Sequence, residues 1–337
     1  MAVVFMDGFD SYNGSAAPAG VLGRWSTTTA VTTSTGRFGG LAVRQSNATS
    51  GGISSPVFTA VSSFSFGCGL SVPIVIAGGR ECIRFNNAST NHVGIGVNSD
   101  GSVYATRNAT TLGTSATGII AVGTATWYTL EVEVVISDTV GRVTIYVDGT
   151  SVLNLTSQDT RNGATTTVDT LQIGSIVTNG WIFDFDDVYI TDSATKPTNA
   201  LRVETLVPNG DGATLNFTLS TGTSHFAVVD ELPANTTDYA SGSAVGDLDE
   251  LDLTNLSATP TTIEAVQVGA VWLKTDATAR SMALEVKSGA TTSTGSNYAL
   301  NTTGRKDTRL LTTDPDTGAA WTASAVNALK TRTKVTV

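Results

Sequence analysis

The sequence has few charged residues, and its basic residues are not clustered. Only 14% of its 337 residues are Asp, Glu, Lys or Arg, and the formal net charge is −10. Nucleic-acid binding needs grouped Lys and Arg side chains that neutralise phosphates. The composition therefore argues against a nucleic-acid partner, and the excess of acid is better explained by solubility.

Long apolar runs are also missing. The opening residues 1–10 contain no basic region followed by an apolar core, and no later run approaches the length of a membrane span. We therefore expect no membrane insertion, and synthesis and folding in a cytoplasm. Cys68 and Cys82 are the only cysteines, and both lie in apolar, strand-like stretches. We expect two buried free thiols, since a disulfide would need a matched geometry.

Lysine is absent from the first 195 residues, whereas all six lysines lie at Lys196 or later. This segregation indicates two modules. Residues 191–201 are small, polar and proline-bearing, which is typical of an exposed connection between compact units. We predict a first domain over 1–194, a linker over 195–201 and a second domain over 202–337.

What the sequence does contain is typical of an all-β protein. Its 34 glycines and its Asn-Gly and Asp-Gly pairs separate short alternating apolar runs. Residues 127–137 and 141–149 predict an antiparallel hairpin, and 151–156 extends it to a three-stranded meander. The aromatic-acidic segments 5–12 and 181–192 predict first and last strands that pair in an antiparallel sandwich.

The second module is also predicted to consist mainly of short strands. The alternating runs predict strands over 213–220, 224–231, 262–275 and 281–287, with the last two joined as a hairpin. Residues 318–330 are Ala-rich, with Trp321, Ala325 and Leu329 at fourfold spacing, and predict one short helix near the C-terminus. We expect a second, smaller β-sandwich-like domain.

The first module resembles the concanavalin A-like lectin and glucanase superfamily, especially its laminin-G-like form. The matching segments are DGFDSY followed by Trp25, RFGGLAVR, WYTLEVEV, VTIYVDG and FDDVYITD, in this order over residues 1–195. The resemblance implies a jelly-roll β-sandwich.

The second module resembles one that recurs in virion proteins of tailed bacteriophages. The matching segments are 206–218, 228–241, 246–256, the IEAVQV strand at 263–268, and 314–330. The resemblance implies a minor structural protein on the virion exterior, either on the head surface or on the tail. Its expected partners are other virion proteins and further copies of itself as a homo-oligomer.

Catalytic patterns are weak. Glucanases of this superfamily carry three acids on one strand, and the nearest match, Glu131 with Glu133, lacks the third. We expect these two side chains to alternate toward solvent. The only histidines, His92 and His225, lie in separate modules, and neither a nucleophile elbow nor a phosphate-binding loop is present. We therefore predict a non-enzymatic protein, with a β-glucan hydrolase as the least favoured alternative.

Four acids raise the question of a metal ion. Asp7, Asp10, Asp186 and Asp187 come from the two strands that we expect to pair. Carboxylates from both strands, together with backbone carbonyls, suit a structural Ca²⁺. The alternative is that these acids hydrogen-bond to turns or face water. No other cofactor is expected.

Glycan binding needs an aromatic platform beside amides and acids. The candidates are Trp25, Tyr104, Trp127 and Trp181, although each also fits a core position. The first functional prediction is thus a structural phage protein that aids host adhesion. The main alternative is a receptor-binding lectin that recognises a bacterial surface glycan.

Overall fold

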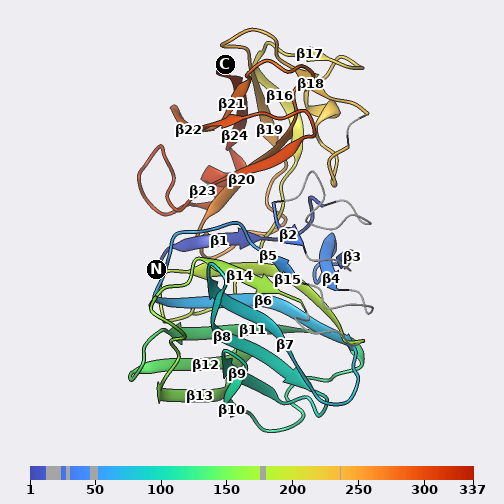
Figure 1. Cartoon of the computed structure of the whole chain (residues 1–337). Helices are drawn as coiled ribbons and strands as arrows, with labels where there is room; N and C mark the ends of the chain where they lie inside the picture. The colour runs from blue at the N-terminus through green and yellow to red at the C-terminus, as the bar shows by residue number, and fades with distance from the viewer. Residues whose placement is uncertain (13–23, 28–30, 46–51, 175–179, 236) are drawn as a thin grey trace. The chain divides into compact units, whose positions relative to one another are not determined.

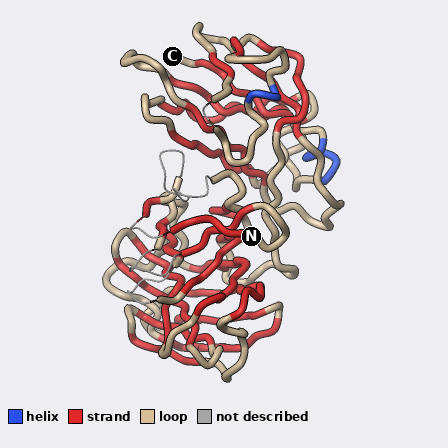
Figure 2. The backbone as a smooth tube through the Cα atoms, turned by 90° about the vertical axis from the view of Figure 1, so that its right-hand side faces the viewer, coloured by secondary structure: helices blue, strands red, loops and turns tan. Residues whose placement is uncertain are grey.

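The computed structural model describes residues 1–12, 24–27, 31–45, 52–174, 180–235 and 237–337. They form two compact units, divided between Val203 and Glu204. In each unit the regular secondary structure is almost wholly strand, with loops between the strands (Figure 2). The all-β prediction is therefore confirmed. Among the described residues, no helix has the length and apolar character needed to cross a membrane.

The first unit contains two antiparallel sheets, A and B, that face each other (Figure 1). Sheet A has the order β13-β12-β11-β6-β15-β4-β3, with β1 also paired to β15, and sheet B has the order β10-β9-β8-β7-β14-β5-β2. The strands of sheet A are β1 (Val3–Asp7), β3 (Val31–Thr35), β4 (Leu41–Gln45), β6 (Ser63–Ile74), β11 (Thr124–Val135), β12 (Gly141–Val147), β13 (Thr150–Gln158) and β15 (Ile182–Thr191). Those of sheet B are β2 (Ser26–Thr27), β5 (Ile53–Ser54), β7 (Gly79–Asn87), β8 (Thr90–Asn98), β9 (Val103–Arg107), β10 (Thr110–Thr114) and β14 (Thr170–Ile173).

The pairings predicted for this unit are confirmed. β11 pairs with β12 and β12 pairs with β13, as the meander requires. β1 pairs with β15 from Val3↔Thr191 to Asp7↔Val188. Alternate residues of β11, such as Leu130 and Val132, point between the sheets and are at most 1% exposed. The period of two thus places one apolar side of each strand in a common core.

Both cysteines belong to this core. Cys68 on β6 and Cys82 on β7 are buried and unpaired, which confirms the expectation of free thiols. Burial raises the pKa of both thiols. The side chains are therefore protonated and act as small apolar groups.

The second unit contains a five-stranded sheet of order β16-β19-β24-β21-β22 and two separate strand pairs, β17-β18 and β20-β23. Its core lies between β20, β21 and β23 and the segment around Trp321. Its elements are β16 (Pro208–Leu215), β17 (Thr218–Leu219), η2 (Phe226–Val228), β18 (Ala240–Ser241), β19 (Leu248–Leu253), β20 (Val266–Trp272), β21 (Ser281–Ser288), β22 (Thr291–Ala299), β23 (Arg305–Leu311), α1 (Ala323–Asn327) and β24 (Lys330–Val335).

Four local predictions for this unit were wrong or too long. Residues 213–220 are divided between the end of β16 and the short β17. The predicted strand over 224–231 is absent, and Phe226–Val228 within it form the short 3₁₀ turn η2. β20 pairs with β23, not with β21, and the side chain of Trp272 on β20 donates to Asp307 on β23 at 2.7 Å. The helix is present, but it covers only α1, because Trp321 forms a bridge with Ile263 before it and β24 begins at Lys330.

A close approach in sheet A gives a stability prediction. The ring of Tyr189 lies on Gly67, where an added Cβ would come within 2.2 Å of Cζ. We expect Gly67→Ala to lower the free energy of unfolding by about 1–3 kcal/mol through overpacking. Gly269→Ala is the matched control, since its Cβ would meet atoms only at 3.4 Å and beyond. Urea unfolding followed by tryptophan fluorescence measures both, and equal losses would contradict the prediction.

Candidate functional site

The outward side of sheet B carries a row of hydrogen-bonding side chains. The register aligns Ser54, Gln172, Arg84, Gly94 and Thr106 across β5, β14, β7, β8 and β9. Neighbouring strands in a sheet are about 4.8 Å apart, so the row spans roughly 20 Å. Alternation causes this arrangement, because Gln172, Arg84 and Gly94 each lie between two buried apolar residues of the core. We call this row, together with Glu81 and Tyr104, the polar face.

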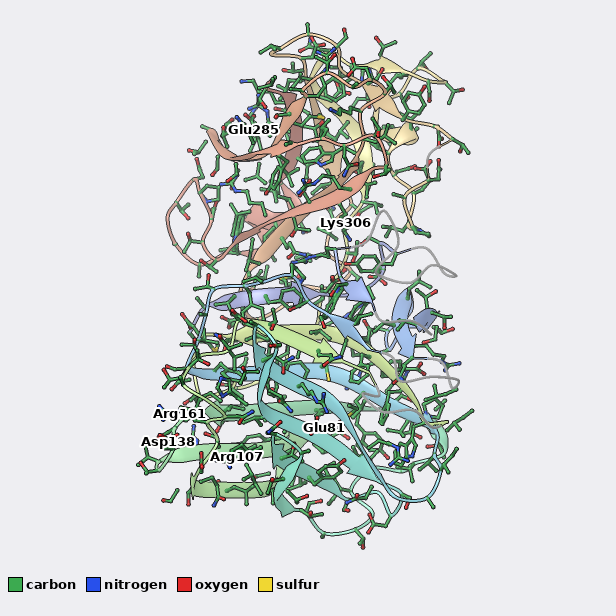
Figure 3. The ribbon with its side chains drawn as sticks, viewed as in Figure 1. Glu81, Arg107, Asp138, Arg161, Glu285 and Lys306 are labelled. Carbon is green, nitrogen blue, oxygen red and sulfur yellow. The ribbon has the colours of Figure 1, made fainter. Side chains whose placement is uncertain are left out.

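Glu81 on β7 lies at the centre of the polar face (Figure 3). Arg84 forms an ion pair with its Oε1, and the hydroxyl of Thr106 donates to its Oε2 at 2.5 Å. Gly94 makes this geometry possible, since a Cβ there would lie 2.2 Å from Glu81 Oε2. Both carboxylate oxygens are thus occupied, and the Glu81 side chain is held in place.

Tyr104 on β9 supplies an aromatic ring to the same face. The ring lies over Gly96, where a Cβ would come within 2.2 Å of its Cζ, and the residue is half-buried. Burial, reinforced by Cys82 and Glu81, raises the pKa of the Tyr104 phenol. The hydroxyl therefore stays protonated at neutral pH and serves as a hydrogen-bond donor or acceptor.

The polar face suits the binding of a hydroxylated ligand more than glycoside cleavage. A guanidinium, a side-chain amide and several hydroxyls lie beside one half-buried ring, which is the mixture that sugar hydroxyls and sugar ring faces require. Canonical glycoside hydrolysis uses two carboxyl groups, about 5–9.5 Å apart. The residues of the polar face include one acid, Glu81, whose oxygens are already paired.

The predicted aromatic platform residues are not brought together. Trp25 and Trp181 are 3% and 1% exposed and belong to the core, where Trp25 donates to Asp7 and Trp181 stacks on Phe183. Trp127 is half-buried on β11, in sheet A, whereas Tyr104 is in sheet B. Of the four, only Tyr104 lies on the polar face.

The four predicted calcium ligands divide into two groups. Asp7 accepts hydrogen bonds from Tyr12, Trp25 and the backbone of Phe9, all within 3.1 Å. Arg24 lies 3.8 Å from the same carboxylate. These donors and the cation satisfy Asp7, which anchors the residues after β1.

Asp10, Asp186 and Asp187 lie near one another, and backbone donors occupy most of their oxygens. Asp186 accepts from the amides of Arg37 at 2.7 Å and Asp187 at 2.8 Å, and Asp187 Oδ1 accepts from Val203 at 2.8 Å. The buried Asp187 Oδ2 has no hydrogen-bond partner among the described residues.

This arrangement does not match a calcium cage. Within the described ranges, no group of three His, Cys, Asp or Glu side chains is placed to hold a metal ion. Calcium binding requires six to eight oxygen ligands, whereas here the carboxylates face backbone amides. Calcium binding by these acids therefore stays a prediction, and the donor arrangement gives it no support.

Glu131 and Glu133 are on the outward side of sheet A, as the alternation predicts, but they are only 0% and 6% exposed. Lys196 explains their burial: its Nζ lies 2.9 Å from Glu131 Oε2 and its backbone amide donates to Glu133 at 3.0 Å. Tyr189 also donates to Glu131, and Arg142 lies 3.5 Å from Glu133. The expectation that the two acids face solvent was wrong, because residues 194–197 pass over them.

Residues 195–201, which we expected to form a linker, thus contribute contacts to the first unit. Pro197 is buried, and the guanidinium of Arg142 donates to the carbonyl of Ala194 at 2.5 Å. The amide of Val203 then binds Asp187. The segment is therefore held against sheet A at Lys196 and Pro197, and by its flanking residues Ala194 and Val203.

The sequence analysis missed Glu81, Arg84 and Gln172. The signal was available in part, because residues 83–86 alternate apolar and polar side chains and Gly94 and Gly96 repeat at a period of two. The strand order β5-β14-β7 is what aligns Gln172 with Arg84, and it joins segments that are far apart in the sequence.

Comparison with models of protein families gave no match, and comparison with curated protein sequences gave none either. Among solved structures, the chain is similar to Trypanosoma rangeli sialidase, with 12% identity and a TM-score of 0.36 over 49% of this chain and 27% of the sialidase. It is also similar to the cellulose induced protein Cip1 (11% identity, TM-score 0.41, 59% of this chain and 100% of Cip1). A third similar structure is the alginate lyase Aly36B (15% identity, TM-score 0.39, 56% of this chain and 97% of Aly36B). The chain spans about a quarter of the sialidase. All three TM-scores are below 0.5, so none of these likenesses assigns a function.

The carboxyl groups of Asp186 and Asp187 predict an unusual pH dependence of the free energy of unfolding. Burial, with the neighbouring carboxylates, raises the pKa of Asp186 to about 7, and burial raises the pKa of Asp187 to about 6. The folded state therefore binds more protons than the unfolded state between about pH 4 and 7, so these groups stabilise the fold most at low pH and less as the pH rises.

We expect Asp186→Asn to remove roughly 1–3 kcal/mol of this decline between pH 4 and 7.5. Unfolding by urea at several pH values, with the wild type compared at each, measures the difference. A variant that keeps the full slope would contradict the assignment. Added Ca²⁺ or EDTA should leave the unfolding midpoint unchanged, and a marked rise with Ca²⁺ would instead support the calcium prediction.

The Lys196–Glu131 pair gives a second prediction. Lys196→Met leaves a buried carboxylate without its cation, which we expect to lower the free energy of unfolding by about 3–5 kcal/mol. The double variant Lys196→Met with Glu131→Gln should recover much of the loss. Arg280→Met is the control, because it breaks a far more exposed pair and should cost at most about 1 kcal/mol. A double variant as unstable as the single one would contradict this account.

Proposed function

We propose that the chain is a non-enzymatic structural protein on the exterior of a tailed-phage virion, present in several copies as a head-surface decoration, a fibre or a minor tail protein. The virion assignment is supported by the resemblance of segments in residues 206–330 to phage virion proteins. The chain would reach this place after synthesis in the host cytoplasm, and its partners would be other virion proteins.

The non-enzymatic part is supported by one observation above all: the two acids that most resemble a glycosidase pair are buried and already bonded to other groups of the chain. Glu131 is held by Lys196 and Tyr189, and Glu133 by the backbone of Lys196. A general acid or a nucleophile needs a carboxyl group within reach of the substrate, whereas these two are buried under residues 194–197. The hydrolase alternative therefore has little support.

The location can be tested on particles. A culture that carries the gene in its phage genome is induced, particles are purified by density gradient, and an antibody to the chain is applied with gold label in electron microscopy. We expect label on intact particles, at the head surface or the tail. Recovery of the chain only in the soluble fraction, with unlabelled particles, would overturn the proposal.

A second candidate function, a receptor-binding lectin, is favoured by the polar face. Arg84, Gln172 and Tyr104 offer donors, acceptors and a ring on one open side of sheet B. The ligand class would be a bacterial surface glycan, and binding would serve adhesion of the particle to its host.

We expect a glycan array probed with the full chain to give signals that fall at least tenfold in Arg84→Ala and in Gln172→Ala. Thr156→Ala, an exposed position on β13 of sheet A, is the matched control and should keep full binding. Trp127→Ala tests which sheet binds the glycan, because loss of binding in this variant would place the ligand on sheet A. Absence of binding to any glycan removes the lectin function, and release of cleaved sugars would contradict the non-enzymatic assignment.

A further inference from the structure

The five-stranded sheet of the second unit ends in an open strand. β22 (Thr291–Ala299) is the last strand in the order β16-β19-β24-β21-β22, and within the described ranges it pairs only with β21. Its sequence, TTSTGSNYA, contains no charged residue and no proline over nine residues. Proteins normally defend such edges with Lys, Pro or short length, because the free backbone groups are a template for another strand.

The register shows which backbone groups are free. Gly289 and Ala290 form a two-residue turn, so Ser288 and Thr291 are the hydrogen-bonded pair that closes the hairpin. Pairs alternate in an antiparallel ladder, and therefore Val286↔Ser293 is also hydrogen-bonded.

Thr292 and Thr294 consequently direct their N–H and C=O groups away from β21. Both residues are exposed, although Thr292 accepts a hydrogen bond from Arg332 at 2.6 Å and Thr294 donates one to Glu285 at 3.1 Å. A register shift follows only beyond Thr294, between the partners of Ala283 and Glu285. The pairing of β22 with β21 is therefore regular at Thr292 and Thr294, whose backbone groups are free.

β22 is also held in place before any partner arrives. The guanidinium of Arg309 on β23 donates to the Ser293 carbonyl at 2.6 Å and to its hydroxyl at 2.5 Å. Further along the strand, the hydroxyl of Tyr298 donates to the carbonyl of Thr308 at 3.1 Å. A strand that is already fixed in an extended form loses less conformational entropy on pairing.

The opposite edge of the same sheet is defended. β16 begins at Pro208, carries the charged Asp211 and contains glycines, and its register with β19 shifts twice. Proline, charge and irregular register each hinder the addition of a strand. The difference between the two edges singles out β22.

We propose that β22 is a self-association site at which the β22 strand of a second copy of this chain adds in antiparallel orientation, joining two five-stranded sheets across a twofold axis. Antiparallel pairing of a segment with itself is symmetric, so one strand provides both halves of the interface. The neutrality of β22 matters here, because each copy has a net charge of −10 and a charged edge would add like-charge repulsion at the axis. This inference does not depend on the virion assignment.

The test uses sedimentation velocity of the full chain over a wide concentration range. We expect a monomer–dimer equilibrium, and a dimer dissociation constant that rises at least tenfold in Thr294→Lys, which places two ammonium groups near the axis. Thr156→Lys is the matched control, since it adds the same charge to β13, an edge strand of sheet A, and should leave the dimer intact. Thr292→Lys provides a second edge variant should Thr294→Lys fold poorly.

Amide hydrogen exchange gives a direct readout. The amides of Thr292 and Thr294 should exchange more slowly as the protein concentration rises, while those of β16 should not change. A wild-type chain that stays monomeric at every concentration would overturn the proposal. So would a dimer that Thr294→Lys leaves intact, a dimer that Thr156→Lys dissociates, or exchange at 292 and 294 that is independent of concentration.

Discussion

The pairing of β15 with three other strands is the constraint on which the first unit depends. β15 binds β6 along most of its length, β4 through Phe183–Phe185 and β1 through Val188–Thr191. It therefore joins the earliest and latest parts of the unit, and it carries Tyr189 to Glu131 and Asp187 to Val203. Because these contacts are far apart in sequence, sheet A is complete only when the last strand is in place.

The chain has few charged side chains, and several of its acids are paired with a nearby basic side chain. Glu131 meets Lys196, Glu81 meets Arg84, and in the second unit Glu250 and Glu285 flank Arg332 at 3.7 and 3.6 Å. Each pair lies on the outward side of a sheet, where alternation places polar residues, yet several of these acids are nearly inaccessible. Loss of one partner of such a pair leaves a costly unpaired buried charge, and the Glu250–Arg332–Glu285 group links the neighbouring strands β19, β24 and β21 in this way.

The sequence predicted most of the local architecture of the first unit. The period of two in 127–137 and 141–149 gave the correct hairpin, since alternation decides which side of a strand faces the core. Alternation does not reveal what lies over the other side, and so Glu131 was expected in solvent. In the same way Trp25 and Trp181 were candidates for a ligand platform, although tertiary packing places both in the core. The polar face depends on strand order, which a single sequence does not display.

The two buried thiols carry a consequence for durability. With Cys68 and Cys82 each protonated and separate, the folded chain contains no bond that an oxidant must make or a reductant can break. Its cohesion comes from non-covalent interactions: packing, hydrogen bonding and ion pairs such as Lys196–Glu131. Passage from a reducing interior to an oxidising medium therefore leaves its covalent connectivity untouched.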